Sequence, residues 1–217
     1  FKKNQKHRQK IILIGNLKLL KKQLSKLKHS FKINKIDYHN EAIKDFVNII
    51  DIELKHNKVF DKISTKSNKY IENSFKTCLD ILNKNKDKTI MINGPISKKS
   101  FLNKKYLGIT EYLSKKTNSK NEVMLIYNEN LSVSPLTTHI PIKYVSKKIT
   151  KKKIINNILT IDKFYKKYLG KKAKFAVLGL NPHCETIDKF SEEEKIIKPS
   201  INSLKKKGIK VDGPYPA

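Results

Sequence analysis

Two histidines that each follow an apolar run are the residues of this chain best suited by type and position to chemistry. His139 lies near the end of residues 131–141, and His183 ends residues 175–183. A neutral imidazole is the commonest metal ligand in proteins. Because ligands of open α/β sheets bind outside the carboxyl ends of the strands, histidines just past two strand ends are candidate metal ligands. Taken singly, each is more simply a hydrogen-bonded loop residue, but their equivalent placement favours a metal.

The elements that must position these histidines follow a strand, crossover helix, strand pattern, which is the unit of a parallel sheet. The two apolar runs supply the strands. Residues 150–169 between them have helical periodicity, with Thr150 as the N-terminal cap and Gly170 as the C-terminal cap. Pro135 within the first run indicates an edge or a bulge. Residues 123–127 are predicted to form a strand beside that run.

A third predicted strand end carries residues that suit an anionic ligand. Residues 89–93 (TIMIN) predict a short buried strand, and the following Gly94 and Pro95 let the backbone approach a ligand closely. Lys98 then offers a cation, although a strand-to-helix turn with a surface lysine explains the same residues. Thr110 is predicted to be the N-cap of a short helix, and the start of a helix is also an anion site.

Local patterns predict further elements along the chain. Apolar runs indicate strands, and apolar side chains at helical spacing indicate helices. Residues 41–50 mix apolar and acidic side chains, and the sequence does not assign them an element. The remaining expected elements are strands at residues 11–14 and 31–36 and helices at residues 16–29, 67–85 and 191–207, the last opened by a capping-box pattern and ended by Gly208.

Length and composition bound the class of protein. The 217 residues suit one large domain or two small ones. No apolar run approaches the ~20 residues that a membrane span needs, and no signal peptide is visible, so no membrane association is expected. The two cysteines, Cys78 and Cys184, form no disulfide framework, which predicts a cytoplasmic protein.

The formal net charge of +29 raises the question of nucleic-acid binding. The basic residues are almost all lysine, and Arg8 is the only arginine. Arginine is the side chain preferred for bidentate contacts to phosphate and guanine. The lysines are spread through every segment, and asparagine and isoleucine share their AT-rich codons, so genome composition is a sufficient cause. Nucleic-acid binding is therefore only a rival interpretation.

Five short motifs occur in an order and spacing that resemble one enzyme family. They are residues 93–98 (NGPISK), 108–111 (GITE), 137–141 (TTHIP), 179–183 (GLNPH) and 213–217 (GPYPA). Together they resemble the 4-hydroxythreonine-4-phosphate dehydrogenase family of pyridoxal phosphate biosynthesis. The resemblance implies a three-layer α/β/α fold like that of the isocitrate and isopropylmalate dehydrogenases. It also implies a chain truncated at both ends, with one α/β domain at residues 1–97 and a second at 98–217.

The same resemblance implies the chemistry. The family performs an NAD- or NADP-dependent, metal-assisted oxidation of 4-phosphooxy-L-threonine, and the product loses carbon dioxide. His139 and His183 would hold a zinc, magnesium or cobalt ion with a third ligand beyond Ala217. Lys98 and Thr110 would contact the phosphorylated substrate, and the family works as a cytoplasmic homodimer. Catalytic and cofactor-binding residues are not assigned.

Two departures from the family pattern keep other readings open. Ile109 stands where the family usually has a substrate-binding histidine, and residues 185–190 replace a glycine-rich loop. A related dehydrogenase acting on threonate or erythronate phosphate is therefore the nearest alternative. The alternatives of another class are a basic nucleic-acid-binding module and an inactive fragment.

Overall fold

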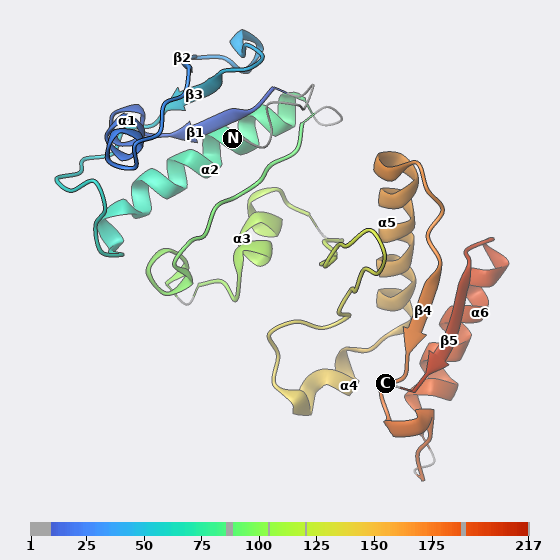
Figure 1. The fold of residues 1–217 in the computed structure, drawn as a ribbon. Coiled ribbons are helices and arrows are strands. Elements are labelled where there is room, and N and C mark those ends of the chain that lie inside the picture. Colours follow the sequence, from blue (N-terminus) through green and yellow to red (C-terminus); the bar gives the residue numbers. More distant parts are fainter. Residues whose placement is uncertain (1–9, 86–88, 104, 120, 188–189, 217) are drawn as a thin grey trace. The chain divides into compact units, whose positions relative to one another are not determined.

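The computed structural model describes residues 10–85, 89–103, 105–119, 121–187 and 190–216. The chain forms two compact units, residues 1–112 and 113–217 (Figure 1). Within the described residues, no helix combines the length and the apolarity needed to cross a membrane.

A three-stranded parallel sheet forms the centre of the first unit. β3 lies between β1 and β2, with Ile12 opposite Asn48 and Ile33 opposite Val47. The unit contains β1 (Ile12–Gly15), α1 (Leu17–Lys26), β2 (Ile33–Lys35), a 3-10 helix (His39–Glu41), β3 (Val47–Asp51), a 3-10 helix (Thr65–Ser67), α2 (Asn68–Lys84) and a π-helical turn (Lys98–Leu102), while α3 (Ile109–Lys116) continues into the second unit.

Asn48 links the strands of this sheet to the loops that precede them. Its side chain is fully buried. The Asn48 Oδ1 accepts the backbone N–H of Ile43 at 2.7 Å, and its Nδ2 donates to the carbonyl of Ile11 at 3.0 Å. A buried amide of this kind is stable only because its donors and acceptor are paired.

An aromatic cluster fixes the segment that leads towards α3. The Phe75 ring on α2 stacks on Phe101 with centroids 5.9 Å apart, and Tyr112 meets both rings edge-on at 5.3 and 5.2 Å. Asn68 also donates from its side chain to the Ser100 carbonyl at 2.9 Å. Phe101 and Tyr112 are therefore held against α2 by packing, and Ser100 is held there by a hydrogen bond.

The second unit is built around a parallel pair of strands connected through a helix. β4 and β5 pair with Phe175 opposite Val211, and α6 connects them (Figure 1, orange to red). The buried core joins α5, α6 and β5 through residues that include Ile154, Leu204 and Val211. The unit contains a 3-10 helix (Ile142–Tyr144), α4 (Val145–Lys148), α5 (Lys151–Leu169), β4 (Phe175–Leu178), a 3-10 turn (Pro182–Cys184), a π-helical turn (Glu193–Ile197), α6 (Lys198–Lys206) and β5 (Val211–Tyr215).

Several predicted elements are confirmed, because local signals determine them. Asn16 caps α1 by accepting the Leu19 N–H at 2.9 Å, and Thr150 caps α5 by accepting the Lys153 N–H at 3.2 Å. Gly170 ends α5 with φ 63°, and Gly208 follows α6 with φ 76°. The predicted strands at residues 11–14 and 31–36, a strand within the run at 175–183 and the helix at 67–85 are also present, with shifted ends.

Three predictions about strands are wrong. Residues 89–97 form no helix or strand, and the Ile90 and Ile92 side chains are 79% and 92% exposed. Residues 123–127 and the run at 131–141 form no strand either, because they share a single antiparallel bridge, between Ile126 and Val133, and the run makes no parallel pair with β4. A strand persists only where a neighbour satisfies its backbone groups, and Pro135 removes one donor. The βαβ unit is therefore β4, α6 and β5, one step further along the chain than predicted.

Candidate functional site

His183 lies in a tight turn directly beyond the carboxyl end of β4. The Gly179 N–H donates to the Tyr215 carbonyl at 2.8 Å, which ties the start of the turn to β5. His183 itself has φ 56° and is exposed, and Cys184 has φ 59°. Left-handed backbone is uncommon for residues other than glycine and persists where the surrounding structure over-determines it. The sequence placed His183 correctly at a strand end.

Glu193 anchors this turn from the start of the following helical segment. Its carboxylate is fully buried. Oε1 accepts the backbone N–H groups of Leu180 at 2.7 Å and Asn181 at 2.9 Å. Oε2 accepts the side-chain amide of Asn181 at 2.9 Å and the hydroxyl of Ser191 at 3.1 Å. These hydrogen bonds join Glu193 to Leu180 and Asn181, which lie 13 and 12 positions earlier in the sequence. A local capping pattern therefore could not predict them.

The hydrogen bonds to Glu193 decide its charge. Burial by itself would raise the pKa of this carboxyl, but the donors from Asn181 and Leu180 outweigh burial and bring the pKa to about 2. The carboxylate is therefore ionised throughout the neutral range. The carboxylate of the neighbouring Glu194 is exposed and pairs with Lys198 one turn along the helix.

Gly179 is required by the close packing inside the turn. A Cβ at this position would lie 2.6 Å from the Cys184 Sγ and 3.3 Å from the Glu193 Oε1. The half-buried Cys184 thiol thus fills the space that a side chain at position 179 would need. The close packing therefore explains why the first residue of the GLNPH motif, Gly179, is a glycine.

His139 lies in the same unit, on a segment that α5 holds in place. The Tyr165 hydroxyl donates to the Ser132 Oγ at 2.9 Å, and the Ser134 hydroxyl lies 3.2 Å from the Asn157 Oδ1. His139 is exposed and, like His183, has a left-handed backbone, with φ 55°. Both candidate ligands therefore have a backbone conformation that non-glycine residues rarely adopt. Such conformations are typical of functional sites.

The donor set fits part of a metal site. Two imidazoles suit zinc or cobalt, and catalytic zinc takes three protein ligands plus an open position. Within the part of the chain that the structure describes, no three His, Cys, Asp or Glu side chains gather closely enough to hold a metal ion. His139 and His183 offer two imidazoles, and a catalytic zinc site would need one more protein ligand.

The candidate substrate residues lie in the first unit and in α3. Ser97 caps the turn that begins at Lys98 by accepting the Ser100 N–H at 3.3 Å, and Lys98 is exposed. α3 begins at Ile109, so Thr110 lies inside its first turn and the prediction that Thr110 is the N-cap is wrong. Thr110 is exposed and Ile109 is half-buried.

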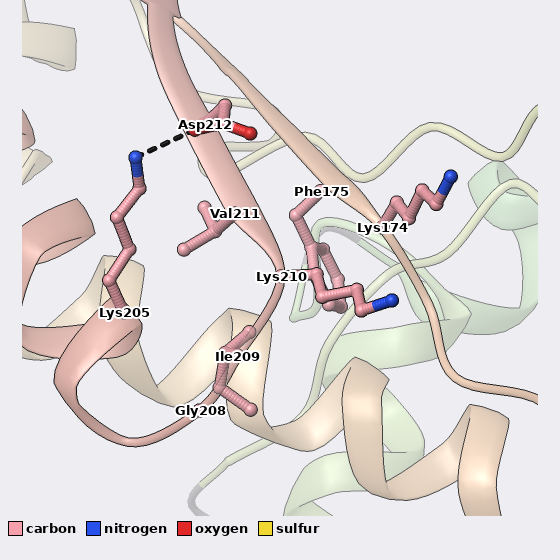
Figure 2. A pocket seen from close by; sticks show the side chains of 8 residues that line it. All are labelled: Lys174, Phe175, Lys205, Gly208, Ile209, Lys210, Val211 and Asp212. Atoms are coloured by element: carbon pink, nitrogen blue, oxygen red, sulfur yellow. Dashed lines mark hydrogen bonds and ion pairs between the residues drawn. The ribbon is translucent and has the colours of Figure 1, made fainter.

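A surface hollow of about 550 Å³ lies at the opposite end of the β4–β5 pair (Figure 2). Phe175 and Val211, the first residues of the two strands, line it together with Lys174, Lys205 and Lys210. The Lys205 ammonium pairs with the Asp212 carboxylate at 2.7 Å (Figure 2). Because it lies at the amino ends of the strands, this hollow is not the site that the histidines would form.

The fold and the strand-end histidine place the chain among α/β proteins whose parallel strands are connected through helices. The chain belongs to the family described as pyridoxal phosphate biosynthetic protein PdxA, whose family model matches residues 7–217. The resemblance inferred from the five motifs is therefore confirmed.

Individual relatives agree with this membership. The chain is 32% identical over 210 residues to the 4-hydroxythreonine-4-phosphate dehydrogenase of Sulfurihydrogenibium sp. (strain YO3AOP1), covering 94% of this chain and 64% of the relative. It is 37% identical over 112 residues to the D-threonate 4-phosphate dehydrogenase of Pectobacterium atrosepticum, covering 51% of this chain and 34% of the relative. The chain therefore spans just under two thirds of the length of the first of these relatives.

Solved structures show the same fold. A 4-hydroxythreonine-4-phosphate dehydrogenase from Burkholderia phymatum aligns with a TM-score of 0.78 at 25% identity, over 94% of this chain and 64% of that one. The corresponding enzyme from Klebsiella pneumoniae aligns with a TM-score of 0.77 at 24% identity, over 94% of this chain and 65% of that one. The α/β class predicted from the sequence is thereby confirmed.

Proposed function

We propose that this chain carries the metal-binding and substrate-binding part of an NAD- or NADP-dependent dehydrogenase of pyridoxal phosphate biosynthesis. The reaction is oxidation of 4-phosphooxy-L-threonine at its secondary hydroxyl to 2-amino-3-oxo-4-phosphooxybutanoate. This β-keto acid then loses carbon dioxide to give 3-amino-2-oxopropyl phosphate. Family membership over residues 7–217 supports the proposal. The observation that carries it is His183, held in a left-handed turn at the end of β4.

His139 and His183 would hold the divalent ion together with a third ligand. Zinc, cobalt or magnesium at this position supplies Lewis-acid polarisation of an alcohol or ketone oxygen. The chain's own contribution is to fix the two imidazoles on constrained backbone, one beyond β4 and one on the segment tied to α5. Hydride transfer belongs to the nicotinamide, and the protein positions it.

Lys98 and Thr110 would bind the phosphorylated end of the substrate. An exposed ammonium and a hydroxyl in the first turn of a helix both favour an anion. The half-buried Ile109 offers no hydrogen bond at the position where the family usually carries histidine. That substitution, together with the likeness to a D-threonate 4-phosphate dehydrogenase, favours threonate 4-phosphate as the second candidate substrate.

The remaining features of the proposal come from the family resemblance. The enzyme would be a cytoplasmic homodimer with a three-layer α/β/α fold like that of the isocitrate dehydrogenases. The resemblance also implies domains at residues 1–97 and 98–217, whereas the compact units divide after residue 112. The two free cysteines, Cys78 and Cys184, are consistent with a reducing compartment.

An assay with matched lysine variants tests the proposed substrate site. The protein is given 4-phosphooxy-L-threonine or threonate 4-phosphate with NAD or NADP and Co²⁺, and formation of reduced nicotinamide is followed. We expect Lys98→Ala to raise KM for the phosphorylated substrate about tenfold, because one charge-assisted contact is lost. Lys99→Ala, which removes the adjacent exposed lysine, should leave KM unchanged.

The outcomes of this assay separate the alternatives. Faster oxidation of threonate 4-phosphate than of 4-phosphooxy-L-threonine would show that threonate 4-phosphate is the preferred substrate. Equal effects of Lys98→Ala and Lys99→Ala on KM would show that Lys98 does not bind the substrate specifically. Failure to oxidise either substrate, combined with a steeply salt-dependent affinity for DNA or RNA, would favour the basic nucleic-acid-binding module instead.

A further inference from the structure

Glu193 is an unusual residue to find as the anchor of a turn. Its carboxylate is completely buried and ionised, and it accepts hydrogen bonds from uncharged donors on Leu180, Asn181 and Ser191. Burying a charge is costly unless hydrogen bonds replace its hydration. An apolar side chain would fill the same space without that cost. The charge therefore points to a need for a strong, directional acceptor at this place.

The hydrogen bonds of Glu193 converge on the backbone just before His183. One oxygen, Oε1, accepts two consecutive backbone N–H groups, those of Leu180 and Asn181. The Asn181 carbonyl in turn accepts the Cys184 N–H at 3.0 Å, and the Pro182 carbonyl accepts the Glu185 N–H at 3.2 Å. A continuous series of hydrogen bonds thus runs from the buried carboxylate to both sides of His183.

This series explains how His183 keeps its left-handed backbone. A non-glycine residue at φ 56° is held there only if the flanking peptide groups are fixed. β5 fixes the start of the turn through Gly179, Glu193 fixes its middle, and the bond between Asn181 and Cys184 closes it. Of these three restraints, only Glu193 acts through a side chain that can be altered without changing the strand pairing.

We propose that Glu193 is a positioning residue for His183: its buried carboxylate holds residues 180–184 in the conformation that presents the imidazole to a divalent metal. The inference rests on the proposed function for the role of the metal, while the holding of the turn stands independently. Glu193 acts through the backbone and does not contact the ion. Supporting groups around metal ligands typically change metal affinity by about 10- to 100-fold when they are removed.

The test compares two adjacent glutamates. Glu193→Gln keeps the shape of the side chain but removes its charge and leaves an amide group facing some of the same donors. Glu194→Gln is the matched control, because Glu194 is exposed and pairs only along its own helix with Lys198. Co²⁺ affinity is measured by calorimetric titration. Amide hydrogen exchange of residues 179–187 is measured by mass spectrometry, and urea unfolding verifies that each variant is folded.

We expect Glu193→Gln to weaken Co²⁺ binding by about tenfold or more and to speed exchange at Leu180 and Asn181. Glu194→Gln should change neither quantity. Unchanged exchange in Glu193→Gln would overturn the inference, and so would unchanged Co²⁺ affinity in a protein that binds Co²⁺ through His183. If the unaltered protein binds no Co²⁺, the proposed metal chemistry fails, and the exchange result alone decides whether Glu193 holds the turn.

A milder variant covers the case in which Glu193→Gln does not fold. Ser191→Ala removes a donor 3.1 Å from Oε2, together with the acceptor of the Glu194 N–H at 3.3 Å, and leaves the carboxylate in place. We expect exchange at Leu180 and Asn181 to rise about tenfold, the effect of one lost hydrogen bond to a charged acceptor. No change in exchange in this variant would contradict a turn held by the carboxylate.

Discussion

Replacing Gly213 by alanine is expected to destabilise the second unit by about 3 kcal/mol or more. Gly213 has φ 129°, a conformation that residues with a side chain rarely adopt. A Cβ there would lie 2.3 Å from the Val177 carbonyl oxygen and 3.2 Å from its carbonyl carbon. Those atoms belong to the backbone of β4, so they cannot rotate away, and the β4–β5 pair would have to separate.

The glycines of the chain provide graded controls for this prediction. Gly208 also has a positive φ, 76°, but open space surrounds its Cβ position, so Gly208→Ala should cost only about 1 kcal/mol. Gly94 has open space and no positive φ, so Gly94→Ala should change stability by less than about 0.5 kcal/mol. Urea unfolding followed by circular dichroism measures all three. Equal losses for Gly213→Ala and Gly208→Ala would show that β4 and β5 do not approach closely at this point.

Acidification is expected to remove about 3 kcal/mol of stability that depends on Glu193. The pKa of this carboxyl is about 2 in the folded chain, below the ordinary value of 4.5. A lowered folded pKa means that the ionised group favours folding. This contribution is complete above about pH 4.5. It is lost progressively as the pH falls towards about 2, where the folded state also takes up the proton.

Glu193→Gln separates this contribution from the general repulsion in a chain of charge +29. Glutamine resembles the protonated acid, so the unaltered protein should be more stable than the variant at neutral pH. The difference in unfolding free energy should shrink towards zero as the pH falls from about 5 to about 2. Glu194→Gln is the matched control for the loss of one exposed carboxylate. A difference for Glu193→Gln that stays constant over this range would contradict the lowered pKa.

Local signals determined most of the helices, and they failed where a distant partner decides the structure. Asn16, Thr150 and Gly170 mark helix ends through bonds to residues within five positions, which a sequence reveals directly. β3 could not be recognised because Asn48 interrupts its apolar pattern. Asn48 is tolerated at the centre of the sheet only because Ile11 and Ile43 pair with its amide.

In the candidate site, too, the sequence predicted what local signals determine and missed what depends on distant residues. The placement of His183 after a strand follows from the apolar run that precedes it, so the sequence was sufficient. The strand predicted at residues 89–93 needed a hydrogen-bonded neighbour that no described segment supplies. The role of Glu193 depends on backbone groups of Leu180 and Asn181, and no spacing rule connects a glutamate to a turn that far upstream.

The central claim is that His139 and His183 bind one divalent ion together, and a Co²⁺ titration of single and double variants tests it most directly. His29→Ala, which removes an exposed histidine of the first unit, is the control and should bind as the unaltered protein does. We predict one Co²⁺ per chain, at least about tenfold weaker binding in His139→Ala and in His183→Ala, and no measurable binding when both are replaced. Binding that survives replacement of both histidines, or losses that add as for two independent ions, would contradict a shared site.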